Sequence, residues 1–150
     1  METTKIGLLN GPNLNLLGLR EPEIYGKVSL SELIIHLKGM ATPHIELIDF
    51  QSNSEGELID FIHNSITNNI EYIILNAGAL THTSIALRDA IKATKTKVIE
   101  VHISNIYCRE EFRRNSLIAP VCIGHISGFG LASYELALHY IQNKALQQNL

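Results

Sequence analysis

Five short apolar runs constrain the fold of this chain most strongly, because a segment of helical periodicity follows each of them. The runs are Lys5–Leu9, Ile45–Phe50, Tyr72–Leu75, Val98–Ile103 and Val121–Ile126. Strands that are apolar almost throughout are typical of a parallel sheet covered by helices on both faces. The repeated order of strand and then helix therefore predicts an α/β protein.

The main helical segments are expected at Ser29–Lys38, Ser54–Ile66, Ser84–Ala93 and Leu131–Gln142, with a shorter one at Arg109–Arg114. Two of them begin with the capping-box pattern, in which a glutamate follows the first serine by three residues: Glu32 after Ser29, and Glu57 after Ser54. Alternating strands and helices in a chain of this size favour a flavodoxin-like, doubly wound sheet of five parallel strands in the order 2-1-3-4-5.

Length and charge limit the kinds of protein this chain can be. Its 150 residues are a usual size for one core, so we expect residues 1–150 to form a single domain. A net charge of −3 argues against nucleic-acid binding, which needs a basic face. No apolar run is long enough for a membrane span or a signal peptide. We therefore expect a cytoplasmic protein with no membrane partner, in which Cys108 and Cys122 are reduced thiols.

Polar residues gather where open α/β sheets bind ligands, at the carboxyl ends of the strands. The residues at or just beyond the first, third and fourth predicted strands, neighbours in the proposed order, are Asn13, Asn76, His82, His102 and Ser104. Glu100 shares one face of the fourth strand with His102. A satisfied buried pair is the structural alternative for these two residues. Five polar residues at one edge favour a single site instead.

The arginines border the same edge. Arg20 lies in the long connection from Asn10 to Val28, which is a candidate lid, and Arg109, Arg113 and Arg114 follow the fourth strand. The alternative for the last three is a solvated helix face paired with the two neighbouring glutamates. An anionic ligand at the sheet edge would favour contact with Arg113 in particular.

Several familiar chemistries lack their motifs. The chain has no GxxxxGK[ST] run, and Gly128–Gly130 lacks the acidic residue that a dinucleotide site requires. The seven histidines are scattered in sequence and predict no metal site. A Schiff-base mechanism has only Lys27 nearby. Serine hydrolysis by Ser84 or Ser104 stays open, although no GxSxG elbow is present.

With these residues in view, the chain closely resembles the type II 3-dehydroquinate dehydratases of the shikimate and quinate pathways. The segments that carry the resemblance are Asn10–Gly18, Arg20–Gly26, Gln51–Leu58, Thr81–Ser84 with Arg88–Ala90, and Glu100–Asn105 followed by Arg109–Arg113. Two departures are Ala77 and Leu80, where the family often has proline and an aromatic residue. They concern the packing of a loop and no proton-transfer residue.

The resemblance implies trans-dehydration of 3-dehydroquinate to 3-dehydroshikimate through an enolate intermediate, with no metal or cofactor. This is a step of the shikimate pathway to the aromatic amino acids, and the same reaction serves quinate breakdown. Tyr25 matches the base, Arg20 the residue that stabilises its phenolate form, and Asn13 the residue that stabilises the enolate. His102 matches the acid that protonates the departing hydroxyl, and Glu100 matches its orienting partner.

Further residues match the family's substrate contacts. Asn76, the Ser104 hydroxyl, and the backbone amides of Ile103 and Ser104 match the pocket for the substrate carboxylate. His82 and Arg113 match contacts to the ring hydroxyls.

The resemblance also implies a homo-oligomer, in which trimers assemble into a dodecamer. Asp89 matches an acidic residue that reaches the site of a neighbouring subunit. The alternative from another class is a non-catalytic flavodoxin-like module that only holds a small acidic metabolite. Such a module would not need Tyr25, Arg20 and His102 together.

Overall fold

The computed structural model describes residues 2–148 and contains one parallel sheet with the strand order β2-β1-β3-β4-β5. The strands are β1 (Thr4–Asn10), β2 (Ile45–Gln51), β3 (Ile70–Asn76), β4 (Lys97–His102) and β5 (Gly124–Ser127). The predicted α/β class, the five parallel strands and their order are therefore confirmed.

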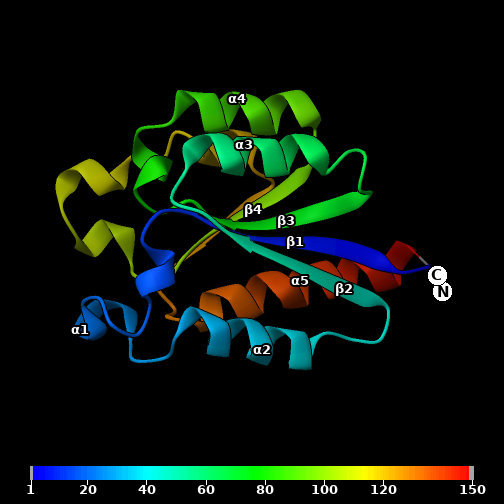
Figure 1. Ribbon diagram of the computed structural model, residues 1–150, viewed down its shortest axis with the longest axis horizontal. Helices are drawn as coiled ribbons and strands as arrows, with labels where there is room; N and C mark the ends of the chain where they lie inside the picture. Colours follow the sequence, from blue (N-terminus) through cyan, green and yellow to red (C-terminus); the bar gives the residue numbers. More distant parts are fainter. Residues whose placement is uncertain (1, 149–150) are drawn as a thin grey trace.

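Helices cover both faces of the sheet, as Figure 1 shows. On one face lie α2 (Leu30–Met40) and α5 (Ala132–Gln148), and on the other lie α3 (Glu55–Asn64) and α4 (Ile85–Thr94). Side chains alternate across each strand, so β1 sends Ile6 and Leu8 to the first layer and Leu9 to the second. Burial of these two apolar layers stabilises the sheet.

Serine caps fix where the helices begin. The Ser29 hydroxyl accepts a 3.2 Å hydrogen bond from the backbone N–H of Glu32, and Ser54 accepts one of 3.4 Å from Glu57. Both predicted capping boxes place the cap one residue before the helix. Ser84 caps α4 in the same way.

Two predicted elements differ from the structure. The run Val121–Ile126 is not one strand, because Ala119–Val121 forms a 3-10 turn and β5 begins only at Gly124. Pro120 lacks the N–H that a sheet ladder needs, which favours the turn. The helix predicted at Arg109–Arg114 is only a 3-10 turn, Glu111–Arg114, and another 3-10 turn, Ile106–Cys108, precedes it.

The long connection after β1 carries two short helical turns. Leu14–Leu16 forms a 3-10 turn, and α1 (Pro22–Tyr25) forms one turn of helix with proline at its first position. Leu14 and Leu17 are buried in the core, but none of residues 18–30 is buried. In Figure 1 this connection and the turns after β4 meet at the carboxyl end of the sheet. Within residues 2–148, no helix has the length and apolar character to cross a membrane.

Candidate active site

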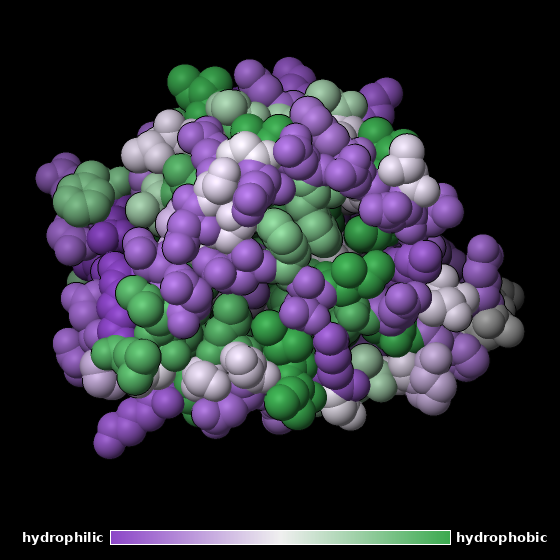
Figure 2. Space-filling model, in the orientation of Figure 1, coloured by the Kyte–Doolittle hydropathy of each residue, from purple (hydrophilic) through white to green (hydrophobic). Residues whose placement is uncertain are grey.

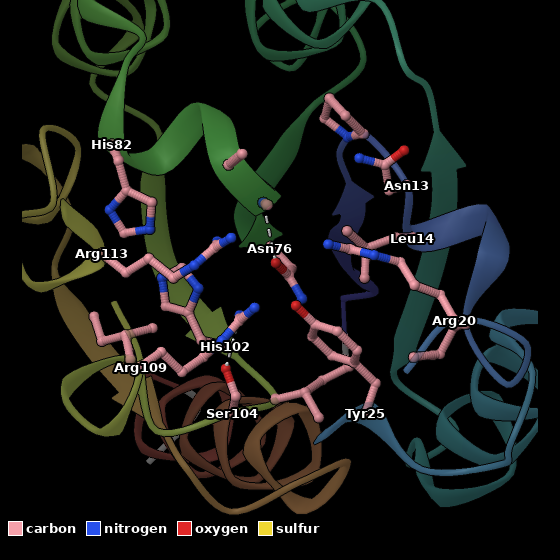
Figure 3. A pocket seen from close by; sticks show the side chains of 16 residues that line it. Asn13, Leu14, Arg20, Tyr25, Asn76, His82, His102, Ser104, Arg109 and Arg113 are labelled. Atoms are coloured by element: carbon pink, nitrogen blue, oxygen red, sulfur yellow. Dashed lines mark hydrogen bonds between the residues drawn. The ribbon is translucent and has the colours of Figure 1, made fainter. Parts of the chain in front are cut away.

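A hollow opens at the carboxyl ends of β1, β3 and β4 (Figure 3). The empty space within it, including the part open to solvent, is about 650 Å³. Its lining residues are Pro12, Asn13, Leu14, Leu17, Arg20, Tyr25, Asn76, Gly78, Ala79, His82, His102, Ile103, Ser104, Ile106, Arg109 and Arg113.

Nine of the predicted site residues therefore lie in one pocket: Asn13, Arg20, Tyr25, Asn76, His82, His102, Ile103, Ser104 and Arg113. Glu100 is completely buried behind His102 and does not line the hollow. Asp89 lies on α4 with its side chain exposed, and it also lies outside the lining.

Tyr25 enters the pocket between two guanidinium groups. The Cζ atom of Arg20 lies 5.1 Å from the centroid of the Tyr25 ring, and that of Arg109 lies 5.3 Å from it. Positive charge near a phenol favours its ionised form. Arg109 was expected only to border the site, and the structure brings it against the ring from the turns after β4. Its position depends on the path of those turns, which the sequence does not reveal.

His102 faces Tyr25 from the other side of the hollow (Figure 3). The Nε2 atom of His102 lies 2.6 Å from Oε2 of Glu100, and Ser116 donates a 2.8 Å hydrogen bond to the other carboxylate oxygen. A fixed hydrogen bond at one ring nitrogen sets the orientation of an imidazole. Nδ1 is therefore the nitrogen of His102 left to meet a ligand.

The charge state of this cluster follows from its contacts. Burial alone would raise the pKa of Glu100, but hydrogen bonds from His102 and His125 outweigh it and lower the pKa to about 2. Glu100 is therefore an anion at neutral pH. Burial lowers the pKa of His82, and the charges of His102 and Arg113 lower it further, so His82 is mainly neutral there.

His125 on β5 is a member of the cluster that the sequence did not reveal. Its Nδ1 lies 3.0 Å from Oε2 of Glu100, and the hydrogen bond to Glu100 raises the pKa of His125. Glu100, His102 and His125 offer donor atoms within 4.8 Å of one another and are, among residues 2–148, the group that could share a metal ion. The carboxylate already binds both imidazoles directly, so hydrogen bonding accounts for the geometry without an ion.

Asn76 lies at the centre of the hollow, where hydrogen bonds hold its carboxamide in place. Its Nδ2 donates to the Tyr134 hydroxyl at 2.8 Å, and that hydroxyl donates to Oδ1 of Asn10 at 2.6 Å. The Asn76 Oδ1 accepts from the backbone N–H of Gly78 at 3.2 Å. β1 and β3 place the two asparagines side by side, since they are direct partners in the ladder.

The end of β2 and the residues just after it support the loop that carries Asn13. Asn13 has a left-handed backbone conformation with φ of 71°, and its backbone N–H donates to Oδ1 of Asn53 at 3.0 Å. Gln51 donates to the carbonyl of Gly11 at 3.2 Å. Gly11 itself touches the neighbouring loop, because a Cβ there would lie 2.6 Å from the carbonyl oxygen of Ala77. The departure at Ala77 therefore lies where two loops of the site meet.

The contacts of Arg113, Ser84 and Ser104 bear on the alternatives that the sequence left open. Arg113 lines the pocket and also pairs with Glu110 at 2.5 Å, so its contact with a ligand stays a prediction. The Ser84 hydroxyl caps α4 and donates to Glu55, and Ser104 accepts a 3.4 Å bond from Arg109. Neither serine has a hydrogen bond to a histidine within residues 2–148, so the hydrolase alternative gains no support.

The fold and the pocket together define an enzyme of the open α/β class, whose site combines cationic side chains with a phenol and a carboxylate-bound imidazole. A family model described as "Dehydroquinase class II" matches residues 4–142. The chain therefore belongs to the class II dehydroquinase family.

Individual proteins agree with the family match. The 3-dehydroquinate dehydratase of Caldicellulosiruptor saccharolyticus is 53% identical over 139 residues, covering 92% of this chain and 96% of that protein. That of Exiguobacterium sp. is 58% identical over 135 residues, covering 90% and 92%. The crystal structure of the type II dehydroquinase from Butyrivibrio crossotus matches with a TM-score of 0.91 at 44% identity, covering 93% and 98%.

Proposed function

We propose that the pocket dehydrates 3-dehydroquinate to 3-dehydroshikimate, the reaction of the shikimate pathway for which the matched relatives are named. The observation that carries the proposal is the position of Tyr25. Its ring lies between Arg20 and Arg109 in the same hollow as His102, whose imidazole is held by Glu100. A base and an acid thus reach one small ligand from two sides.

The first step removes a proton from carbon. The Tyr25 phenolate takes the proton from the carbon between the ketone and the tertiary alcohol, and the electrons of that C–H bond form an enolate. Nearby positive charge favours a phenolate, and the guanidinium groups of Arg20 and Arg109 supply that charge beside the Tyr25 ring. Asn13 stabilises the negative enolate oxygen.

The second step expels water. The enolate electrons return to form the carbon–carbon double bond, the C–O bond of the tertiary alcohol breaks, and the proton of His102 leaves with the hydroxide as water. Tyr25 has gained one proton and His102 has lost one, so exchange with solvent restores both. The net products are the conjugated ketone and one water. Glu100 stabilises the imidazolium that must be present before this step.

The rest of the pocket holds the substrate. Asn76, the Ser104 hydroxyl, and the backbone amides of Ile103 and Ser104 bind the substrate carboxylate. His82 and Arg113 bind ring hydroxyls. The Nδ1 atom of His82 is engaged with the backbone carbonyl of Asn115 at 2.9 Å, which leaves Nε2 for the ligand. These side chains need no metal or cofactor for the proposed steps.

Assembly and location belong to the same proposal. We infer a cytoplasmic homo-oligomer, with trimers assembled into a dodecamer and Asp89 reaching a neighbouring subunit's site. Figure 2 shows apolar side chains gathered over α1 and α2, and Leu19, Ile35 and Met40 are exposed along this stretch. Exposed apolar patches favour protein–protein contact, and the exposed Asp89 carboxylate is free to meet a partner. Light scattering of the purified protein tests the assembly.

The test of the reaction is direct. Purified protein mixed with 3-dehydroquinate should produce the near-ultraviolet absorbance of the conjugated product, and a metal chelator should leave the rate unchanged. Folded protein that produces no absorbance would refute the proposal. A ligand that raises the melting temperature but is recovered unchanged would favour the binding-module alternative.

A further inference from the structure

One carboxylate oxygen of Glu100 contacts two imidazoles. Oε2 lies 2.6 Å from His102 Nε2 and 3.0 Å from His125 Nδ1, while Ser116 occupies the other oxygen. The two rings are adjacent, with centroids 5.6 Å apart. Glu100 is fully buried, so bulk water does not screen this competition as it would on the surface.

Strand register brings the second imidazole into place. Glu100 and His125 are direct partners in the parallel ladder of β4 and β5, so their side chains stand on the same face of the sheet. His102 lies two residues further along β4 and shares that face. The carboxylate is therefore reached from its own strand and from the neighbouring one.

We propose that His125 is a positioning residue, which limits how strongly Glu100 holds the proton of His102 by competing for the same carboxylate oxygen. The inference rests on the proposed function in taking His102 as the general acid. A carboxylate oxygen that accepts a second charge-assisted hydrogen bond stabilises the first donor less. His125 thereby keeps His102 able to release its proton to the departing hydroxyl.

The groups around Glu100 determine whether loss of His125 strengthens or weakens the interaction of Glu100 with His102. Of the described residues, His102 and His125 are the two that form ion pairs with Oε2. His82 stacks on His102 with centroids 6.3 Å apart, and burial, with a smaller effect from the charge of Arg113, lowers the pKa of His82. The Cys122 thiol feels the charge of Glu100, but burial raises its pKa to about 12, so it stays neutral. When His125 is removed, the Glu100 carboxylate therefore interacts more strongly with His102.

The test compares His125→Leu with His125→Asn. Leucine removes the hydrogen-bond donor, so the basic limb of the kcat profile should move to higher pH. An NMR titration of the His102 imidazole without substrate should move in the same direction. Asparagine places an amide N–H near the position of Nδ1, and its shift should be smaller. An unmoved His102 titration in His125→Leu, or a loss of kcat that is equal at every pH, would overturn the proposal.

The unmodified protein offers a second measurement. As the pH is varied, the chemical shift of His102 should change in two phases, one of them at the midpoint of the His125 titration. A single phase would contradict the coupling between the two histidines. His63→Gln, on the exposed last turn of α3, is the matched control and should change neither profile. Because the NMR titration uses no substrate, it still tests His125 if 3-dehydroquinate is not turned over.

Discussion

The hydroxyl of Tyr134 accepts a hydrogen bond of 2.8 Å from the carboxamide of Asn76, so the last helix is bonded directly to the floor of the pocket. Tyr134 is fully buried, and its hydroxyl also donates to Asn10. A carboxamide presents a donor on one side and an acceptor on the other. The phenol therefore determines which side of Asn76 meets a ligand.

Tyr134→Phe should weaken both folding and substrate binding. The change leaves polar groups of Asn10 and Asn76 buried without their partner, which costs about 1–3 kcal/mol in the free energy of unfolding. KM should rise more than kcat falls, because the proposed contact of Asn76 with the substrate carboxylate is the same before and during the reaction. Urea unfolding and steady-state kinetics measure the two effects. Tyr140→Phe, on the exposed side of the same helix, is the control, and an unchanged KM in Tyr134→Phe would contradict the role.

Tyr25→Phe should remove the proposed base while keeping the aromatic ring. We expect kcat to fall by about 10² to 10⁴ or more, the usual contribution of a general base, with an unchanged circular dichroism spectrum. The absorbance assay measures the rate. Tyr107→Phe, at an exposed tyrosine outside the pocket lining, should keep full activity. A Tyr25→Phe enzyme with most of its activity would show that another group is the base.

Arg109→Met should move the activity of the enzyme to higher pH. Removing one of the two cations beside Tyr25 takes away charge that favours a phenolate, so the acidic limb of kcat/KM should move to higher pH and the rate at neutral pH should fall. Arg114→Met, which alters an exposed arginine outside the pocket lining, is the control. An acidic limb that stays in place would remove Arg109 from the activation of Tyr25.

Glu100 should make the fold sensitive to acid. Against the effect of burial, its hydrogen bonds depress its pKa from 4.5 to about 2, so its stabilising contribution is present above pH 4.5 and is lost as the pH falls toward 2. The contribution is on the order of 3 kcal/mol. In Glu100→Gln, the free energy of unfolding should therefore change less between about pH 5 and pH 2. Glu46→Gln, at an exposed carboxylate of β2, should retain the acid sensitivity of the unmodified chain.

Gly18→Ala should disturb the segment that carries Tyr25. Gly18 has φ of 92°, and a Cβ there would lie 2.9 Å from the carbonyl oxygen of Lys27, so the two ends of the segment must separate. We expect a tenfold or greater loss of kcat, with a loss of about 1–2 kcal/mol in unfolding free energy. Gly39→Ala in α2, where a Cβ meets no atom within 4 Å, should stabilise the protein slightly. Full activity in Gly18→Ala would show that the segment tolerates the change.

Periodicity and capping residues were enough to predict the strands and the starts of α2 and α3, because these depend on local patterns of apolar and polar residues. The strand order followed from the usual order of doubly wound sheets. The predicted strand at residues 121–126 was too long, because Pro120 favours a 3-10 turn just before it. The polar residues at the strand ends also predicted where the pocket lies. The roles assigned to them remain predictions.

Contacts between distant segments could not be predicted in the same way. His125 meets Glu100 only because β4 and β5 pair in one register, and a shift of one residue would turn the imidazole to the other face. Arg109 reaches Tyr25 only through the path of two irregular turns. Neither register nor loop path has a periodic signal in the sequence.

The segment from Gly18 to Leu30 holds Tyr25 without a single buried residue, whereas His102 lies within the buried sheet. The two ends of the proposed proton transfer therefore differ in local stability. Mild heat, low denaturant or a protease that nicks this segment would inactivate the protein while its sheet stays folded. Inactivation and unfolding are then separate events, and a preparation with a native circular dichroism spectrum can still lack activity.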